Sequence, residues 1–123
     1  MNRWIALGIG TLFGGYGRYI LDGLVHQTLG SKFPYGTMVI NLAGCFVIGM
    51  LDALSEKFLL STAARVLLMT GFCGAFTTFS TFMLETFHLV RGGELVRAAA
   101  NVSISFAVGF ALFYLGTLIV RSI

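Results

Sequence analysis

Long stretches without a single charged residue divide this chain, and they constrain its fold more than any other feature. No Asp, Glu, Lys or Arg occurs in residues 33–51, 66–84 or 98–120, which are 19, 19 and 23 residues long. A helix needs about 20 apolar residues to cross the hydrocarbon core of a bilayer. The three stretches therefore predict membrane-spanning helices.

A fourth apolar segment lies near the N-terminus, where residues 4–17 are uncharged and the apolar character resumes after Arg18. The whole chain is 57% hydrophobic and only 11% charged, whereas a soluble domain has about 25% charged residues. We therefore predict an all-α membrane protein that forms a single transmembrane domain over residues 1–123. Its four transmembrane helices are expected at about 4–29, 35–55, 63–90 and 95–120.

Several other classes of protein are not expected. The short connections leave no room for a soluble enzyme domain, and Arg18 interrupts the first segment, which also lacks the cleavage site of a signal peptide. Cys45 and Cys73 lie within spans and are expected to be free thiols, unless their helices meet closely enough for a disulfide. His26 and His88 lack the spacing of a transition-metal site. No cluster of Lys and Arg favours nucleic acid as a partner.

Residues 70–82 are unusually polar and aromatic for the middle of a span. These thirteen positions hold four Phe, five Ser or Thr and two Gly. Gly71 and Gly74 weaken a helix, and the hydroxyl side chains can bond the backbone groups that a break would free. We expect the third helix to break near 74–79. Two half-helices would then meet, with a carbonyl end that attracts cations and an amide end that attracts anions.

Two phenylalanines and one acidic residue follow this expected break. Phe79 and Phe82 share a face of the second half-helix, because they are three positions apart. They are either ordinary packing or a pair whose positively polarised ring edges contact an anion. Glu85 follows one turn later, and it is either a helix-end charge near the headgroups or a polar partner of a pore.

The other helices carry isolated polar residues. Asn41 is a lone amide in an apolar span, so it either ties two helices together or donates hydrogen bonds into a pore. Arg18 either snorkels to the membrane surface or draws anions to a pore mouth. Asn101 and Ser105 share a face of the last span, which Gly109 continues. The serine hydroxyl either bonds its own helix or forms a polar track with Asn41.

Basic residues are divided almost evenly between the two sides of this four-helix topology. Four lie on the side with both termini, and three, or four with Arg18, lie on the other. Either such small counts carry no information about orientation, or the chain inserts both ways up. Four short helices also make a thin bundle, so we expect oligomers. The pairs Gly10–Gly14 and Ser105–Gly109 would allow close helix contact.

Three motifs together resemble the Fluc (CrcB) family of fluoride channels. Residues 14–19 read Gly-Gly-Tyr-Gly-Arg-Tyr, residues 36–44 contain Gly-Thr-x-x-x-Asn-x-x-Gly, and residues 71–82 contain Gly-x-Cys-Gly-x-x-Thr-Thr-Phe-Ser-Thr-Phe. The resemblance covers all four spans, and its third motif is the most specific. Gly109 stands where several relatives have serine, and Ala75 replaces a frequent glycine.

The resemblance implies a fluoride-selective channel of the cell inner membrane that exports fluoride passively. The family forms antiparallel, dual-topology homodimers with two pores, each built from both subunits. The positions expected to line the fluoride pore are Asn41, Phe79, Phe82, Ser105, Thr81, Glu85 and Arg18. The resemblance also implies a structural sodium ion at the dimer interface, held by backbone carbonyls at Gly74 and Thr77.

Two other functions compete with this one. A small dual-topology exporter of organic cations or protons would need an acidic residue deep in a span. Glu85 is the only candidate, and it lies toward a helix end. A non-transporting assembly subunit would explain the glycines of the spans, but it would not explain the hydroxyl-rich run at 70–82.

Overall fold

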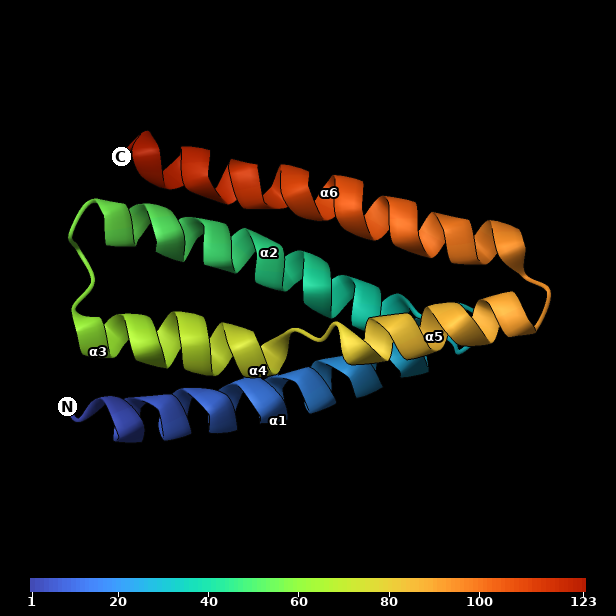
Figure 1. The fold of residues 1–123 in the computed structure, drawn as a ribbon, viewed down its shortest axis with the longest axis horizontal. Coiled ribbons are helices and arrows are strands. Elements are labelled where there is room, and N and C mark those ends of the chain that lie inside the picture. The colour runs from blue at the N-terminus through green and yellow to red at the C-terminus, as the bar shows by residue number, and fades with distance from the viewer.

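The computed structural model describes all residues from Met1 to Ile123 and contains helices but no strand. Four long helical segments run antiparallel to their neighbours in the chain, and both termini lie at the same end of the bundle (Figure 1). The all-helical prediction is confirmed. The elements are α1 (Arg3–Leu29), α2 (Tyr35–Glu56), α3 (Thr62–Arg65), the π-helix η1 (Val66–Cys73), α4 (Gly74–Phe76), α5 (Ser80–Arg91) and α6 (Leu95–Arg121).

Three of the four segments are long and apolar enough to cross a membrane. They are Tyr35–Glu56, Thr62–Arg91 and Leu95–Arg121. The first helix, α1, is 27 residues long, but Arg18 and Asp22 make it less apolar than the others. The three apolar segments support the predicted membrane protein.

The helix ends follow from local sequence. Asn2 caps α1 by accepting a hydrogen bond from the backbone N–H of Trp4 at 2.8 Å, and Ser61 caps α3 in the same way through Ala64. Such side-chain oxygens satisfy N–H groups that have no partner within the helix. At the other end of α1, Gly30 follows the last helical residue with φ of 82°, a positive value that glycine adopts without a steric penalty.

Glycines bring α1 against the first half of the third segment. A Cβ atom on Gly10 would collide with the backbone carbonyl of Leu67, and one on Gly14 would collide with that of Phe72. A Cβ on Gly71 would lie 3.0 Å from the Cα of Gly10. The expected close contact at Gly10 and Gly14 therefore exists, but within one chain.

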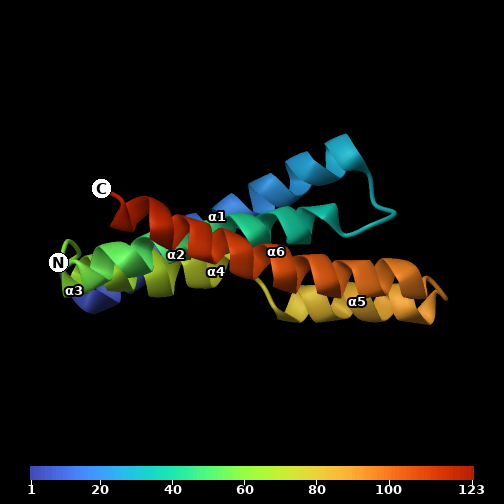
Figure 2. The same cartoon turned by 90° about the horizontal axis from the view of Figure 1, so that it is seen from above.

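Helices α2 and α6 pack along one another through a second set of glycine contacts. A Cβ on Gly49 would collide with the carbonyl of Phe113, and one on Gly116 with the carbonyl of Phe46. Thr117 also donates a hydrogen bond from its hydroxyl to the carbonyl of Gly49 at 3.2 Å. Seen from above, α5 runs beside α6, whereas the end of α1 diverges from both (Figure 2).

Candidate functional site

The third segment is interrupted at residues 77–79, in the middle of the molecule (Figure 1). Helix α4 ends at Phe76, Thr77 is extended with φ of −84° and ψ of 159°, and α5 begins at Ser80. The interruption occupies the end of the window predicted at 74–79. Gly74 itself is helical, with φ of −63°, so the chain leaves the helix at the threonines rather than at the glycine.

Asn41 of α2 pairs with both backbone groups of Thr78 at this break. Its Oδ1 accepts a hydrogen bond from the Thr78 N–H at 2.8 Å, and its Nδ2 donates to the Thr78 carbonyl at 2.9 Å. The Thr78 hydroxyl in turn accepts from the N–H of Thr81 at 3.3 Å, in the first turn of α5. Because backbone groups must be satisfied at membrane depth, the asparagine makes this break tolerable. It ties two helices together, which was one of the two roles expected for it.

Thr77 ends the first half-helix on the other side of the break. Its N–H and its hydroxyl both donate to the carbonyl of Cys73, at 3.0 and 2.8 Å. Its own carbonyl accepts no backbone N–H. A Cβ on Gly44 would collide with the Thr77 methyl group, so the missing side chain of Gly44 allows α2 to approach the break. Asn41, Thr77 and Phe79 all line one groove of about 310 Å³, which Gly74 also lines.

The two phenylalanines of α5 lie close together but in different surroundings. The Phe79 and Phe82 ring centroids are 6.0 Å apart. Phe82 is 4% exposed, whereas Phe79 is 67% exposed. Phe106 of α6 meets Phe82 in an edge-on arrangement, with centroids 6.3 Å apart and planes at 60°. Phe82 is therefore held between its own helix and α6, while Phe79 points outward.

Three of the predicted pore residues converge on a second groove. Asn41, Phe82 and Ser105 line this groove of about 350 Å³, together with Phe106 and Gly109. The Ser105 hydroxyl is buried and has no hydrogen-bond partner, so it does not bond its own helix. A free donor, an amide and an aromatic ring from three different helices therefore share one concave surface.

Glu85 lies in a third, more polar cavity toward the loop end of the bundle. One of its carboxylate oxygens accepts a hydrogen bond from the hydroxyl of Thr37 at 2.9 Å. The other, Oε2, is buried without a partner. The cavity has about 380 Å³, and Asp22, His26 and His88 also line it. Glu85 thus connects α5 to the start of α2 rather than lying free at a helix end.

Two of the predicted pore residues lie outside these three cavities. Arg18 and Thr81 are both half-buried, and neither lines any of the cavities. The contact of Phe106 with Phe82 and the hydrogen bond from Thr37 to Glu85 were not predicted from the sequence. Phe106 directly follows Ser105, and Thr37 belongs to the Gly-Thr-x-x-x-Asn motif. Both residues therefore lie beside or within sequence features that had already been singled out.

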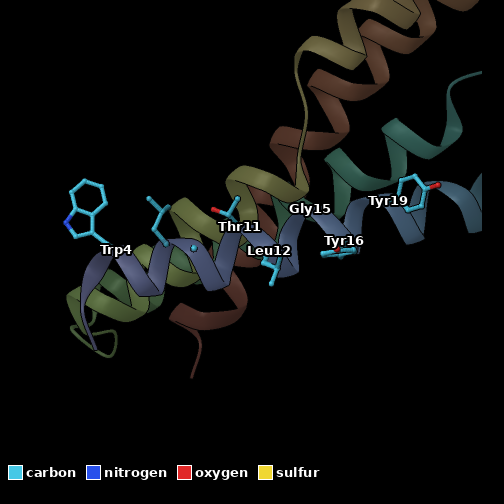
Figure 3. Close-up of a pocket in the computed structure, with 8 residues that line it drawn as sticks. Trp4, Thr11, Leu12, Gly15, Tyr16 and Tyr19 are labelled. Carbon is cyan, nitrogen blue, oxygen red and sulfur yellow. The ribbon is translucent and has the colours of Figure 1, made fainter.

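A larger groove lies on the outer face of α1 and contains none of the predicted site residues (Figure 3). It has about 570 Å³ and is lined by Trp4, Leu12, Tyr16 and Tyr19 among others. Its lining is almost entirely apolar and carries no charged residue. The polar residues predicted for the site that line a cavity therefore lie at the break or around Glu85, and not in this groove on α1.

Comparison with known proteins identifies the family of the chain. The family model described as "CrcB-like protein, Camphor Resistance (CrcB)" matches residues 5–117. The chain belongs to the CrcB family. The matched region includes every residue predicted for the site, from Arg18 in α1 to Ser105 in α6, so the three cavities lie within the part that defines a CrcB protein.

Curated CrcB relatives resemble the chain over nearly its full length. A protein of Solidesulfovibrio magneticus is 44% identical over 121 residues, which cover 95% of this chain and 97% of the relative. A protein of Chlorobaculum tepidum is 43% identical over 122 residues, covering 98% and 96%. A protein of Nitrosococcus oceani is 45% identical over 115 residues, covering 92% and 90%. Each is named "Fluoride-specific ion channel FluC".

Proposed function

We propose that the protein is a fluoride-selective ion channel of the cell inner membrane that exports fluoride passively and so limits its toxicity in the cytoplasm. The name shared by the full-length relatives supports the ion. The observation that carries the proposal is the convergence of Asn41, Phe82 and Ser105 on one groove inside a membrane bundle. No nucleotide-binding motif or soluble domain is expected from the sequence, so flow down the electrochemical gradient is the simplest mechanism.

The groove offers fluoride weak replacements for its water. The Ser105 hydroxyl has no partner and can donate to an anion. The Asn41 amide has two N–H donors and uses one of them on Thr78. The ring edge of Phe82 in this groove, and that of Phe79 in the groove at the break, carry partial positive charge and attract an anion weakly. Conduction needs contacts that are strong enough for binding and weak enough for release, and this mixture has that character.

We propose that two copies assemble as an antiparallel, dual-topology homodimer, with four spans in each copy and two pores. The nearly even distribution of basic residues supports insertion in both orientations. Phe79 is 67% exposed although it neighbours the groove at the break, so a partner subunit would complete that wall. Labelling of cysteines placed in each loop, from either side of the membrane, tests this arrangement. A single orientation for every loop would contradict it.

A structural sodium ion is proposed at the dimer interface, bound by the backbone carbonyls of Gly74 and Thr77. The Thr77 carbonyl accepts no backbone N–H, and both residues line the same groove, so the donors present fit a hard cation. The carbonyl end of the first half-helix adds a favourable dipole. When bound, the ion supplies a fixed positive charge near the break. Assembly in sodium-free buffer should weaken the dimer.

We propose roles along this path for the remaining predicted residues. Glu85, fixed by Thr37, is proposed as a polar partner at one end of the pore. Arg18 is proposed to draw anions toward the mouth. Thr81 lies in the first turn of α5, where its N–H is already used by Thr78, and its hydroxyl is proposed to face the pore.

Ion flux from liposomes tests the function. The purified protein should release fluoride and retain chloride, and the absence of fluoride flux would refute the channel. Flux that saturates at low turnover would instead favour a transporter. Phe79→Ile and Phe82→Ile should sharply reduce flux while the dimer persists. Phe87→Ile is the matched control, because Phe87 lies on the same helix and is 58% exposed, but lines none of the three cavities.

A further inference from the structure

A partly buried chain of hydrogen bonds runs from α6 into the first turns of α5 and ends on the backbone of Phe82. The Nδ2 of Asn101 donates to the hydroxyl of Thr86 at 2.9 Å. That hydroxyl donates in turn to the carbonyl of Phe82 at 2.7 Å. Asn101 is only 1% exposed, so its amide is committed to this contact rather than to a polar track on the surface of α6.

The bond from Asn101 to Thr86 is the only side-chain hydrogen bond between α5 and α6. The Phe82 ring also packs edge-on against Phe106 of α6 and lies 6.0 Å from the Phe79 ring. Edge-on aromatic packing favours certain ring geometries, but it acts on the rings at the tips of the side chains rather than on the backbone of α5. A hydrogen bond has a preferred distance and angle, so the Asn101–Thr86 pair can fix how α5 is rotated about its own axis.

We propose that Asn101 and Thr86 are positioning residues that orient the Phe82 ring in the anion path. This inference rests on the proposed channel function and extends it to a pair outside the groove, since neither residue lines it. The Thr86 hydroxyl both accepts and donates, and linked hydrogen bonds of this kind strengthen one another in a low-dielectric surrounding. Without the Thr86 hydroxyl, α5 is free to rotate about its own axis. The edge of the Phe82 ring then turns away from the anion path.

The first experiment removes the hydroxyl without changing the shape of the side chain. Thr86→Val should lower fluoride flux from liposomes about tenfold, the scale set by one buried hydrogen bond. Thr86→Ser keeps the hydroxyl and should stay within about twofold of the original protein. Thr28→Val is the matched control. Thr28 makes the same bond to its own helix, to the carbonyl of Leu24 at 2.8 Å, but has no interhelical partner.

A second measurement separates positioning from folding. Incorporation of 4-fluorophenylalanine at position 82 gives a ¹⁹F resonance that reports the surroundings of this ring. It should move or broaden in Thr86→Val and return in Thr86→Ser. Asn101→Leu should do the same, and the double variant Asn101→Leu/Thr86→Val should conduct no worse than Thr86→Val alone, because both changes break one chain.

The outcomes distinguish this inference from the channel itself. Absence of flux from the original protein would refute the channel, whatever the variants do. If the original protein conducts and Thr86→Val conducts equally, with an unchanged ¹⁹F resonance, the positioning role is wrong. It is also wrong if Thr28→Val loses as much flux as Thr86→Val, or if flux and dimer content fall in parallel while the resonance stays unchanged.

Discussion

The two halves of the third helical segment are held in opposite ways. The first half, Thr62–Phe76, lies along α1 through glycines that bring one backbone against the other. The second half, α5, diverges from α1 and runs beside α6 (Figure 2). Its lateral support includes side-chain hydrogen bonds to two neighbouring helices, namely Glu85 to Thr37 and Thr86 to Asn101. Between the two halves, Asn41 of α2 bonds both backbone groups of Thr78.

This difference assigns the two halves different tasks. Close glycine contacts allow extensive van der Waals packing between helices in a membrane, and they leave little freedom to the first half. Hydrogen bonds set the rotation of α5 without covering its surface, so Phe79 stays exposed. The first half is held by close packing and the second by hydrogen bonds. The proposed cation ligands and the proposed anion path lie where the two halves meet, within a few residues of each other. The predictions below test this division of tasks, from the largest expected effect to the smallest.

Replacement of Asn41 should have the largest effect, because it removes the contact by which α2 satisfies the backbone at the break. Asn41→Leu leaves both the N–H and the carbonyl of Thr78 without partners. The expected cost is roughly 3 kcal/mol of unfolding free energy, together with loss of fluoride flux. Asn41→Asp keeps an acceptor for the Thr78 N–H but loses the donor, so it should fall in between. Thermal unfolding in detergent and liposome flux would check both, and unchanged values for Asn41→Leu would show that the break is held by other contacts.

A glycine of α1 tests whether close helix packing stabilises the first half of the third segment. Gly10→Ala forces a methyl group against the Leu67 carbonyl, which should destabilise the protein by about 2 kcal/mol. Gly8→Ala is its matched control, two positions away, where a Cβ meets no atom within 4 Å. Because alanine is the better helix former, the control should equal or exceed the original protein in stability. Equal thermal midpoints for the two variants would mean that close contact does not hold the first half.

A smaller effect is expected where α2 approaches the break. Gly44→Ala displaces the Thr77 methyl group and forces that side chain out of its bond to the Cys73 carbonyl. One such hydrogen bond contributes about 1 kcal/mol, so stability should fall modestly while flux falls clearly. Gly23→Ala, in open space on α1, is the control. A loss of stability without a change in flux would separate Thr77 from the conduction path.

The spans were predictable because their length is fixed by the bilayer. The uncharged stretches 66–84 and 98–120 lie inside the structural segments Thr62–Arg91 and Leu95–Arg121. The hydroxyl-rich run also indicated a break in the third helix. The run placed the break within residues 74–79, but it did not show that the helix would end at the threonines. Both glycines of the run remain helical, and the helix ends where a side chain from α2 satisfies the backbone.

The partners of the polar residues could not be predicted. Asn41 and Thr78 are 37 positions apart, and periodicity says which face a residue occupies but not what lies opposite. Asn101 and Ser105 share a face of α6, yet Asn101 bonds Thr86 while the Ser105 hydroxyl stays without a partner. Their different positions along the α5–α6 contact determine this, and that contact depends on the tertiary packing.

The smallest effect is expected at the end of the bundle, far from the break. Arg121 and Glu56 form an ion pair at 2.8 Å between α6 and α2, and both side chains are 55% exposed. Solvent and salt screen such pairs, so they contribute little to stability. Arg121→Gln should leave flux unchanged and shift the thermal midpoint less than Gly44→Ala, with the difference disappearing at high salt. If Arg121→Gln reduced flux as strongly as Gly44→Ala, the ends of the helices would control the pore as much as the break does. The different ways in which the two halves of the third segment are held would then not explain which residues control flux.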